Sequence, residues 1–361
     1  MKRILLLIVI LTLLIPTKAL SLGESASSYI LLDMDTNRVL LGKNINNKRL
    51  IASITKIMTA LIAVESNKLD DVVEVDESIL KSYGSGIYIQ VGEKLTLRDL
   101  LYGLMLRSGN DAALMISTYL SKSEEDFVKL MNNKAKEIGM KNTTFQNSSG
   151  LDNETSNYST AYDMAILTSY AMQYEEYRKI VSTKKYTLKT NYKTYIWHNK
   201  NKLLSLGYIT GGKTGFTEKA KRTLVSTAYK DNISLVVVTL NDGNDWNTHK
   251  LLYEYAFKNY KSYKVLSKSN YKVNDDNYYN NNLYINEDVY LTLSINEINK
   301  VTNNIKLTKL DKYKDKEIVG SNNFYLDNIL LKKTNIYIHK ESTPKQKVSF
   351  IKRIWEIIKF W

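Results

Sequence analysis

The glycine-rich stretch GYITGGKTGFT, residues 207–217, constrains the fold more than any other part of the sequence. Residues 207–214 match G-x-x-x-x-G-K-[ST], the pattern of a phosphate-binding loop, which requires a strand before it and a helix after it. Here the preceding run NKNKLLSL is short and polar, and the following run RTLVSTAYKDNISLVVVTLND predicts a strand, a Lys-Asp-Asn turn and a second strand. Because a hairpin is incompatible with a β-α-β phosphate site, we expect Lys213 and Thr214 to lie on a strand edge facing a cleft.

The first 21 residues have the features of an export signal. A basic start precedes an apolar run over residues 4–15, and small residues form the pattern A-x-S that ends at Ser21. The alternative, a transmembrane helix, needs about 20 apolar residues and this run is shorter. We therefore expect residues 1–21 to be a signal peptide and the rest of the chain to act outside the cytoplasm.

Composition excludes several classes of active site. The chain has no cysteine, so neither a disulfide framework nor a thiol nucleophile is available. It has three histidines but no H-E-x-x-H pair, so we expect no zinc site, and G-x-S-x-G is absent, which argues against a lipase-like nucleophile. Without the signal the formal net charge falls from +14 to +11, because Lys2, Arg3 and Lys18 are lost. An exported basic protein meets anionic lipid and wall polymer more readily than nucleic acid.

The amino-acid composition and the spacing of apolar residues change near residue 263. A chain of 361 residues suggests about two domains. Up to this point strand-like runs mix with helical periodicity, which predicts an α/β or α+β domain over residues 24–262. Beyond it the alternating runs DVYLTLSI, NIKLTKL and TNIYIH predict strands of a small β domain over residues 263–340.

A candidate nucleophile lies in IASITKIMTALIAVE, residues 51–65, where Ser53 opens an amphipathic helix. Lys56 follows three residues later on the same helix face, so its amine can reach the hydroxyl. A lysine whose pKa is lowered by burial beside other cations can act as the base that a serine nucleophile needs. The N–H of Ser53, at the positive end of the helix, can also help to hold an oxyanion.

The pattern S-x-x-K is weak alone, since it recurs at Ser182 and Ser349 among other places. Only the Ser53 copy is followed by a long apolar helix and then by S-x-N at 108–110, between two predicted helices. Thr96 and Asp99 form a capping pattern at the start of the first of these, over residues 97–107. The third motif, K-T-G at 213–215, occurs once.

In this order the three motifs resemble the active site of penicillin-binding proteins and serine β-lactamases. The surrounding runs ASITKIMTALIAVE, YGSGIYIQVGEKLTLRDLLYGLMLRSGNDAA and GGKTGFTEKAKRTLVSTA are similar to those of low-molecular-mass D-alanyl-D-alanine carboxypeptidases of the peptidase S11 type. The resemblance covers roughly residues 27–262. It implies an α/β (α+β) transpeptidase-like domain, with an antiparallel sheet flanked by helices, and a small C-terminal all-β domain. One departure is Lys221-Arg222-Thr223, which stands where a small residue or cysteine is expected.

The resemblance also implies catalytic roles. Ser53 would attack the carbonyl of the penultimate D-Ala in a peptidoglycan stem peptide that ends in D-Ala-D-Ala, and Lys56 would take its proton. Ser108 would relay a proton to the departing D-Ala, and Asn110 would orient the substrate amide. Water would then release the acyl-enzyme, and β-lactam antibiotics would inhibit covalently. No metal or organic cofactor is implied.

Substrate-binding roles follow from the third motif in the same way. Lys213 and Thr214, with Gly215, would hold the terminal carboxylate of the stem peptide. The backbone N–H groups of Ser53 and Phe216 would form the oxyanion hole.

Two alternatives remain open. A class A β-lactamase shares the motifs but needs an acidic residue in an E-x-x-L-N setting, and Glu154 lacks that context. The second alternative is an inert wall-binding relative, against which the intact Ser53, Lys56 and Lys213 count.

The last 17 residues, 345–361, predict an amphipathic helix of about 25 Å, too short and too charged to cross a hydrocarbon core of about 30 Å. An amphipathic helix of this kind, which carries Lys, Arg and Trp, lies in the plane of an anionic membrane. We expect it to tether the protein to the outer face of the cytoplasmic membrane; the alternative is that it packs on the β domain. Its apolar half contains Val348, Phe350, Ile351, Ile354, Trp355, Ile357, Ile358 and Trp361.

Overall fold

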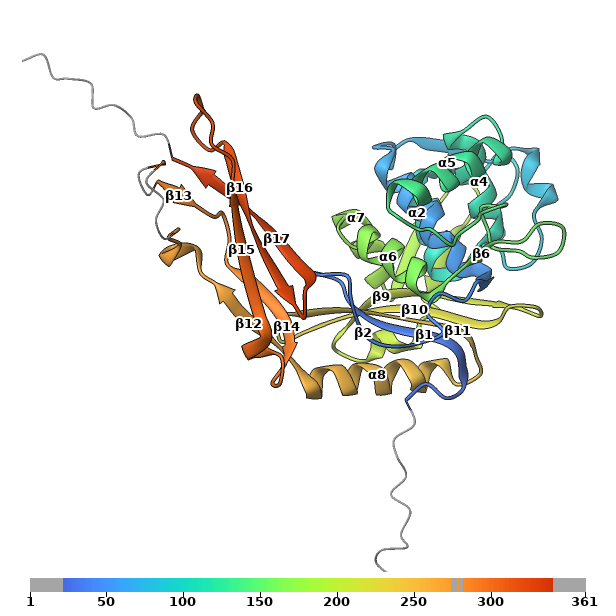
Figure 1. Cartoon of the computed structure of the whole chain (residues 1–361). Helices are drawn as coiled ribbons and strands as arrows, with labels where there is room; N and C mark the ends of the chain where they lie inside the picture. The colour runs from blue at the N-terminus through green and yellow to red at the C-terminus, as the bar shows by residue number, and fades with distance from the viewer. Residues whose placement is uncertain (1–21, 274–277, 280–281, 340–361) are drawn as a thin grey trace, which may run out of the picture. The chain divides into compact units, whose positions relative to one another are not determined.

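The structure, a computed structural model, describes residues 22–273, 278–279 and 282–339 (Figure 1). The predicted signal peptide and the predicted tail helix lie outside these residues. The chain divides into two compact units, the first ending at Asn259 and the second beginning at Tyr260. This division lies three residues before the limit expected from composition, because helix α8 (Asp245–Asn259) is followed directly by strand β12 (Tyr260–Leu266).

The first unit is built on a five-stranded sheet in the order β2-β1-β11-β10-β9, with every neighbouring pair antiparallel. The hairpin predicted after K-T-G is confirmed: Asp231 and Asn232 have φ angles of 52° and 61° and turn β10 into β11. Two successive left-handed residues are what a tight hairpin turn requires. Strand β9 is at the edge of the sheet, as expected. The strands are β1 (Ala26–Asp33), β2 (Arg38–Lys43), β9 (Ile209–Thr217), β10 (Lys221–Lys230) and β11 (Ile233–Asp242).

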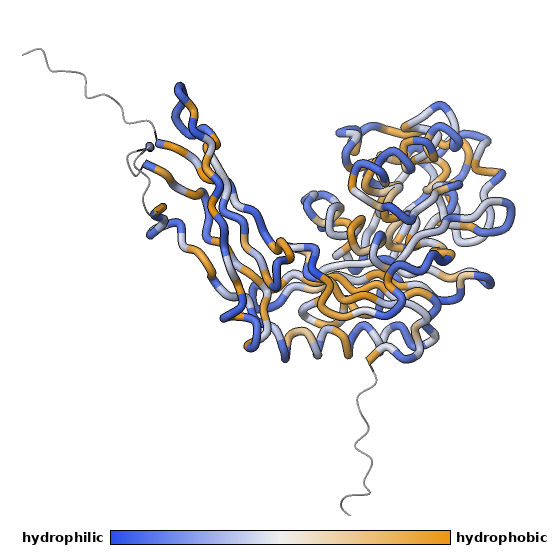
Figure 2. The backbone as a smooth tube through the Cα atoms, in the orientation of Figure 1, coloured by the Kyte–Doolittle hydropathy of each residue, from blue (hydrophilic) through white to orange (hydrophobic). Residues whose placement is uncertain are grey.

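Helices cover both faces of this sheet, which confirms the predicted fold class (Figure 1). Helix α8 packs on one face and α6 (Ala161–Ala171) on the other, with α2 (Lys56–Glu65) against α6. Burial on two faces explains why the central strands are almost continuously apolar, as the hydropathy in Figure 2 shows. The larger core contains Ile30, Leu32, Val236 and Val238 from the sheet.

The remaining helices of the first unit form a layer that carries two of the three motifs. Between α3 and α4 the chain makes a π-helical turn, labelled η3. The elements are the helices α3 (Leu97–Tyr102), α4 (Asn110–Leu120), α5 (Glu124–Glu137) and α7 (Glu175–Ser182), the turns η1 (Ala52–Thr55), η2 (Glu77–Lys81), η3 (Gly103–Arg107) and η4 (Lys202–Ser205), and the strand pairs β3 (Arg49–Leu50) with β6 (Tyr158–Ser159), β4 (Val72–Glu74) with β5 (Lys94–Thr96), and β7 (Lys185–Lys189) with β8 (Thr194–His198).

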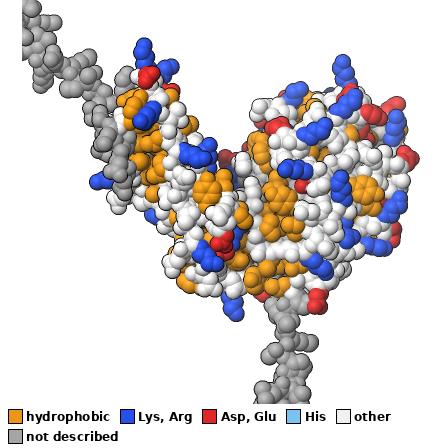
Figure 3. Space-filling view, viewed as in Figure 1, with side chains coloured by type: hydrophobic (Ala, Val, Ile, Leu, Met, Phe, Trp, Pro, Cys, Tyr) orange, Lys and Arg blue, Asp and Glu red, His pale blue; other side chains and the backbone are white. Residues whose placement is uncertain are grey.

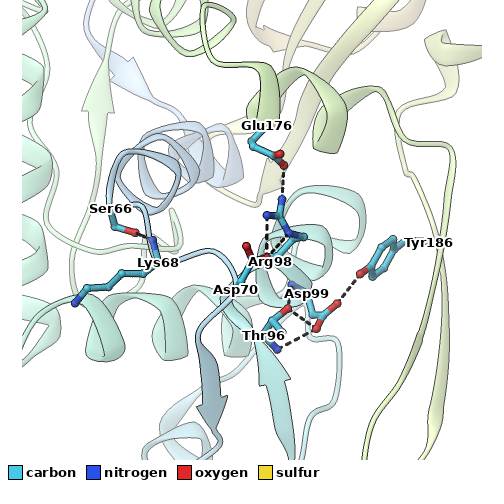
Figure 4. A network of polar contacts seen from close by, with 8 residues as sticks. All are labelled: Ser66, Lys68, Asp70, Thr96, Arg98, Asp99, Glu176 and Tyr186. Carbon is cyan, nitrogen blue, oxygen red and sulfur yellow. Dashed lines mark hydrogen bonds and ion pairs between the residues drawn. The ribbon is translucent and has the colours of Figure 1, made fainter.

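A polar network fixes the start of α3 (Figure 4). The predicted capping box is present: Asp99 N donates to Thr96 Oγ1 at 3.1 Å, and Thr96 N donates to Asp99 Oδ2 at 2.9 Å. Tyr186 on β7 donates its hydroxyl to the same Asp99 carboxylate. Arg98 pairs with Asp70 and with Glu176 on α7. These contacts hold α3 against α7 and β7, so the residues that follow α3 start from a fixed position.

The second unit contains two antiparallel sheets around its own apolar core, which includes Leu291, Val319 and Ile336. The three runs predicted as strands overlap β14, β15 and β17, but the second run, NIKLTKL, overlaps β15 only at residues 304–307. Strand β16 has no counterpart among the predicted strands, because its polar centre, Gly-Ser-Asn-Asn, interrupts the apolar alternation. The elements are β12, β13 (Leu283–Tyr284), β14 (Val289–Ser294), β15 (Val301–Leu307), β16 (Ile318–Leu326) and β17 (Ile329–Ile338), with the turns η5 (Lys268–Asn270) and η6 (Ile298–Lys300).

Charged side chains of both signs are scattered over the visible surface of each unit, with apolar side chains between them (Figure 3). Among residues 22–273, 278–279 and 282–339, no helix combines the length and the apolar character that a membrane span needs.

Candidate active site

Ser53 lies in η1, a single 3-10 turn, and not in the first turn of an α-helix as the sequence suggested. In a 3-10 turn residues three positions apart are eclipsed, which brings the side chain of Lys56, the first residue of α2, over Ser53. Lys56 Nζ donates to Ser53 Oγ at 3.1 Å. The residue before the serine, Ala52, has a φ of 49°, a conformation that costs a non-glycine residue about 1–2 kcal/mol. The chain therefore accepts local strain immediately before Ser53.

Lys56 is fully buried, although it carries an amine. Its Nζ also donates to Asn110 Oδ1 at 2.8 Å and to Ser149 O at 2.6 Å. Burial, helped by the nearby charge of Lys200 and opposed by Asp111, lowers the pKa of Lys56 from 10.5 to about 7. A large fraction of the amine is thus unprotonated at neutral pH, and this form can accept the proton of the Ser53 hydroxyl.

The S-x-N motif forms the second side of the site. Ser108 follows the π-helical turn with a φ of 67°, and Asn110 begins α4 after Gly109. Both polar side chains are buried. Asn110 N donates to Ser85 O at 2.7 Å, and Asn110 Nδ2 donates to Tyr83 O at 2.7 Å, so the segment before β5 holds the asparagine.

The K-T-G motif forms the third side, on edge strand β9. Lys213 is buried and its Nζ donates to Ser108 Oγ at 3.0 Å and to Thr214 O at 2.7 Å. Burial, with smaller contributions from the charges of Lys56 and Lys200, holds the pKa of Lys213 well below its usual value. An anion bound beside Lys213 would favour the charged amine again.

Gly215 allows β9 to approach Ser53 closely. A Cβ atom at this position would lie 2.3 Å from Thr223 Oγ1 and 3.0 Å from Ser53 N, so no larger residue fits without displacement. The next residue, Phe216, is 57% exposed, and it pairs with Arg222 of β10.

The fold therefore brings the three motifs together from η1, α4 and β9, as the sequence predicted. The hydroxyls of Ser53 and Ser108 each accept a hydrogen bond from a buried lysine with a lowered pKa. Such a site can transfer a proton to and from a hydroxyl nucleophile and can bind an anionic substrate. Within the described part of the chain, no group of three or more His, Asp and Glu residues is arranged to hold a metal ion.

Sequence reasoning missed the second layer of the site. Lys200, between β8 and η4, is exposed, and its charge lowers the pKa of both Lys56 and Lys213. The carbonyl of Ser149 accepts from Lys56, and Gly150, with φ of 88°, allows this loop to touch Ala52 O. Only the glycine in N-S-S-G is a local signal for this contact.

His198, His249 and Glu154 make none of the contacts described among the three motifs. The side chain of His198 is exposed at the end of β8, and Glu154 is exposed in the loop that precedes β6. His249 is buried between Ser226 and Thr239, and burial lowers its pKa to about 3, so it is neutral at physiological pH.

Comparison with known proteins agrees with this geometry. Residues 17–244 match the model of the peptidase S11 family, D-alanyl-D-alanine carboxypeptidase, which confirms the resemblance drawn from the motifs. The D-alanyl-D-alanine carboxypeptidase DacF of Bacillus subtilis is 37% identical over 260 residues, which are 69% of this chain and 66% of that protein. DacC of Escherichia coli is 33% identical over 251 residues, 64% of this chain and 61% of that protein. The chain thus spans slightly less than two thirds of these relatives.

Solved structures show the same likeness. Penicillin-binding protein 5 of Haemophilus influenzae superposes with a TM-score of 0.71 at 26% identity, covering 88% of this chain and 97% of that one. The D-alanyl-D-alanine carboxypeptidase DacD of Francisella tularensis gives a TM-score of 0.65 at 25% identity, covering 87% of this chain and 93% of that one.

Proposed function

The chain belongs to the D-alanyl-D-alanine carboxypeptidase family of serine peptidases, and we propose that it removes the terminal D-alanine from peptidoglycan stem pentapeptides through an acyl-enzyme on Ser53. The observation that carries the proposal is the contact between Lys56 Nζ and Ser53 Oγ at 3.1 Å, with a lysine pKa of about 7. A base whose pKa lies near the working pH serves general base catalysis best.

Acylation begins when the neutral amine of Lys56 takes the proton of Ser53. The freed Oγ attacks the carbonyl carbon of the penultimate D-Ala, and the oxyanion is held by the backbone N–H groups of Ser53 and Phe216. Each such donor is worth about 3 kcal/mol of barrier in acyl-transfer enzymes. When the tetrahedral intermediate collapses, the peptide C–N bond breaks, and the departing amine receives through Ser108 the proton that Lys56 took from Ser53, which leaves Lys56 neutral again.

Recognition of the substrate depends on the free carboxylate of the terminal D-Ala. Lys213 and Thr214 bind this carboxylate at the edge of β9, and Gly215 keeps the strand close enough to Ser53 for both contacts at once. The buried position of Lys213 supports the role, since a charge pair formed out of water is stronger than one at the surface. Asn110 orients the amide on the acyl side.

Release of the acyl group requires water, with Lys56 again as the base. The hydroxyl that forms attacks the ester carbonyl, and Ser53 Oγ leaves with the proton that Lys56 returns. A β-lactam enters by the same attack on its ring carbonyl and remains bound as a covalent inhibitor.

We place the enzyme outside the cytoplasmic membrane, after removal of residues 1–21, with residues 345–361 lying on the outer membrane surface. The support is the pattern of both termini in the sequence together with the formal net charge, which is still +11 after Lys2, Arg3 and Lys18 are subtracted from +14. Its partners on this proposal are wall stem peptides and anionic lipid, with no nucleic acid.

Release of D-alanine from a synthetic pentapeptide tests the activity. We expect Ser53→Ala to abolish release, because the proposed covalent nucleophile is lost, with the fold retained. Ser182→Ala is the matched control, since Ser182 begins another S-x-x-K copy but lies exposed at the end of α7. The control Ser182→Ala should release D-alanine at the parent rate. Release by Ser53→Ala at the parent rate would refute the assignment of Ser53 as the nucleophile.

A further inference from the structure

Asp111, the residue after the S-x-N motif, holds a segment that lies more than twenty residues earlier in the chain. Its carboxylate is 7% exposed and accepts backbone N–H groups from Ile87, at 3.0 Å to each oxygen, and from Tyr88 at 2.7 Å. It also accepts from Ala112 N at 2.8 Å. The carboxylate thus ties residues 83–88 to the first turn of α4.

The neighbouring residues leave space for this carboxylate. A Cβ atom at Gly109 would lie 2.7 Å from Asp111 Oδ1, and one at Gly86 would lie 3.2 Å from Oδ2. Tyr88 has a φ of 60°, which residues with a side chain rarely adopt unless their surroundings impose it. On its other side Tyr88 O accepts from Lys193 Nζ at 2.9 Å and from Tyr195 OH at 3.2 Å. The segment is therefore clamped between α4 and the β7–β8 hairpin.

The clamped segment in turn fixes the side chain of Asn110. Tyr83 O accepts from Asn110 Nδ2 at 2.7 Å, and Ser85 O accepts from Asn110 N at 2.7 Å. A carbonyl can only accept, so the contact with Tyr83 requires the amide NH₂ on that side. This leaves Asn110 Oδ1 directed at Lys56 Nζ, 2.8 Å away.

We propose that Asp111 is a positioning residue: by clamping residues 83–88 it fixes the orientation of Asn110, and with it the contact between Asn110 and Lys56. The proposal rests on the proposed function, because it gives Asp111 a part in the same acyl transfer.

The test is Asp111→Asn, followed by the rate of Ser53 acylation with a labelled penicillin across pH. The variant keeps the size of the side chain but removes the charge and turns an NH₂ group toward N–H donors. We expect the rate to fall about tenfold or more, because small displacements of catalytic groups have effects of this order. The Asn110 acceptor and the Asp111 charge both favour protonated Lys56, whereas Lys200 and Lys213 oppose it. The acidic limb of the rate profile should therefore move to lower pH.

Asp163→Asn is the matched control. Asp163 is also a buried carboxylate in the first turn of a helix, α6, and it accepts from Asn142 N at 2.7 Å and Thr143 Oγ1 at 2.8 Å. The Asp163→Asn substitution should lower the stability of the protein. It should change the acylation rate by no more than about twofold and leave the acidic limb of the rate profile at the same pH. Hydrogen exchange at Ile87 and Tyr88 gives a second readout, and should accelerate only in Asp111→Asn.

An Asp111→Asn protein whose acylation rate equals that of the parent, or whose acidic limb stays in place, would overturn the proposal. Unchanged exchange at Ile87 and Tyr88 would overturn it as well, and this readout does not depend on acyl transfer. A parent protein that penicillin does not acylate would instead refute the proposed function, so the two failures are distinct.

Discussion

Two buried lysines with lowered pKa values lie beside two serines, and this arrangement determines the chemistry of the site at the residue scale. Burial favours the neutral amine in each case, but the two lysines have different partners. Lys56 touches Ser53, the proposed nucleophile, whereas Lys213 touches Ser108 on the side of the proposed carboxylate site. A neutral base and an anion site can therefore coexist in one small volume.

The pH dependence of acylation follows from Lys56. Its pKa of about 7 means that the amine is protonated below this pH and cannot accept the Ser53 proton. The rate of acylation by penicillin should therefore rise with pH through an acidic limb near 7 and level off above it. Stopped-flow or quench measurements from about pH 5 to about pH 9 check this. A rate that is flat over the range, or that falls as pH rises through 7, would show that Lys56 is not the base.

Residue patterns predicted which motifs meet, but not their supporting contacts. Ser53, Ser108 and Lys213 stand in recognisable patterns, so the sequence placed them in one site. Lys200 and the carbonyl of Ser149 carry no pattern, because each acts through a contact between segments far apart in the chain.

At the element scale, the close approach of β9 to η1 assembles the site. Gly215 permits it, since a Cβ atom at this position would lie 2.3 Å from Thr223 Oγ1 and 3.0 Å from Ser53 N. Strand β9 pairs with β10, and β10 forms a hairpin with β11, so these pairings fix the register of β9. The site thus depends on how near an edge strand can lie to a 3-10 turn.

Replacing Gly215 with alanine should separate these two elements. The added methyl would meet Thr223 Oγ1 at 2.3 Å, so β9 must shift, with an overpacking cost of about 1–3 kcal/mol. We expect the acylation rate to fall about a hundredfold, as seen for small misplacements of catalytic groups, while the protein stays folded. Acylation kinetics and thermal unfolding measure the two effects. Gly207→Ala is the control, because a Cβ there meets nothing within 4 Å. Parent-like acylation by Gly215→Ala would contradict this account.

Element types were predicted better than their helical details. The Lys-Asp-Asn turn between two apolar runs predicts β10 and β11 directly, and the capping residues Thr96 and Asp99 predict the start of α3. The 3-10 turn at Ser53 and the π-helical turn before Ser108 were not predicted. A turn of four or five residues is too short for its apolar period to distinguish these helix types from an α-helix, so the contacts that select among them lie elsewhere in the chain.

At the scale of the whole molecule, each unit has its own apolar core, and the first contains every residue of the proposed site. If the proposed function is right, we therefore expect the first unit to keep its activity when the end of the chain is altered.

Deleting residues 345–361 should therefore separate location from activity. The segment has five basic residues and one acidic residue beside its apolar half, a pattern suited to an anionic membrane surface. The truncated protein should release D-alanine at the parent rate but should no longer sediment with vesicles that contain anionic lipid. Neutral vesicles and high salt serve as controls for the electrostatic part. Sedimentation equal to that of the parent, or unfolding of the truncated protein, would contradict the proposed anchor.

Mass spectrometry of the intact protein after exposure to a labelled penicillin tests the central claim most directly. The account predicts a stable adduct of one penicillin per chain, located by peptide mapping on Ser53, and its absence in Ser53→Ala. Absence of an adduct from the parent would indicate an inert relative. Rapid turnover of the penicillin would indicate a β-lactamase, and a stable adduct on another residue would show that the nucleophile was misassigned; each result would contradict the account.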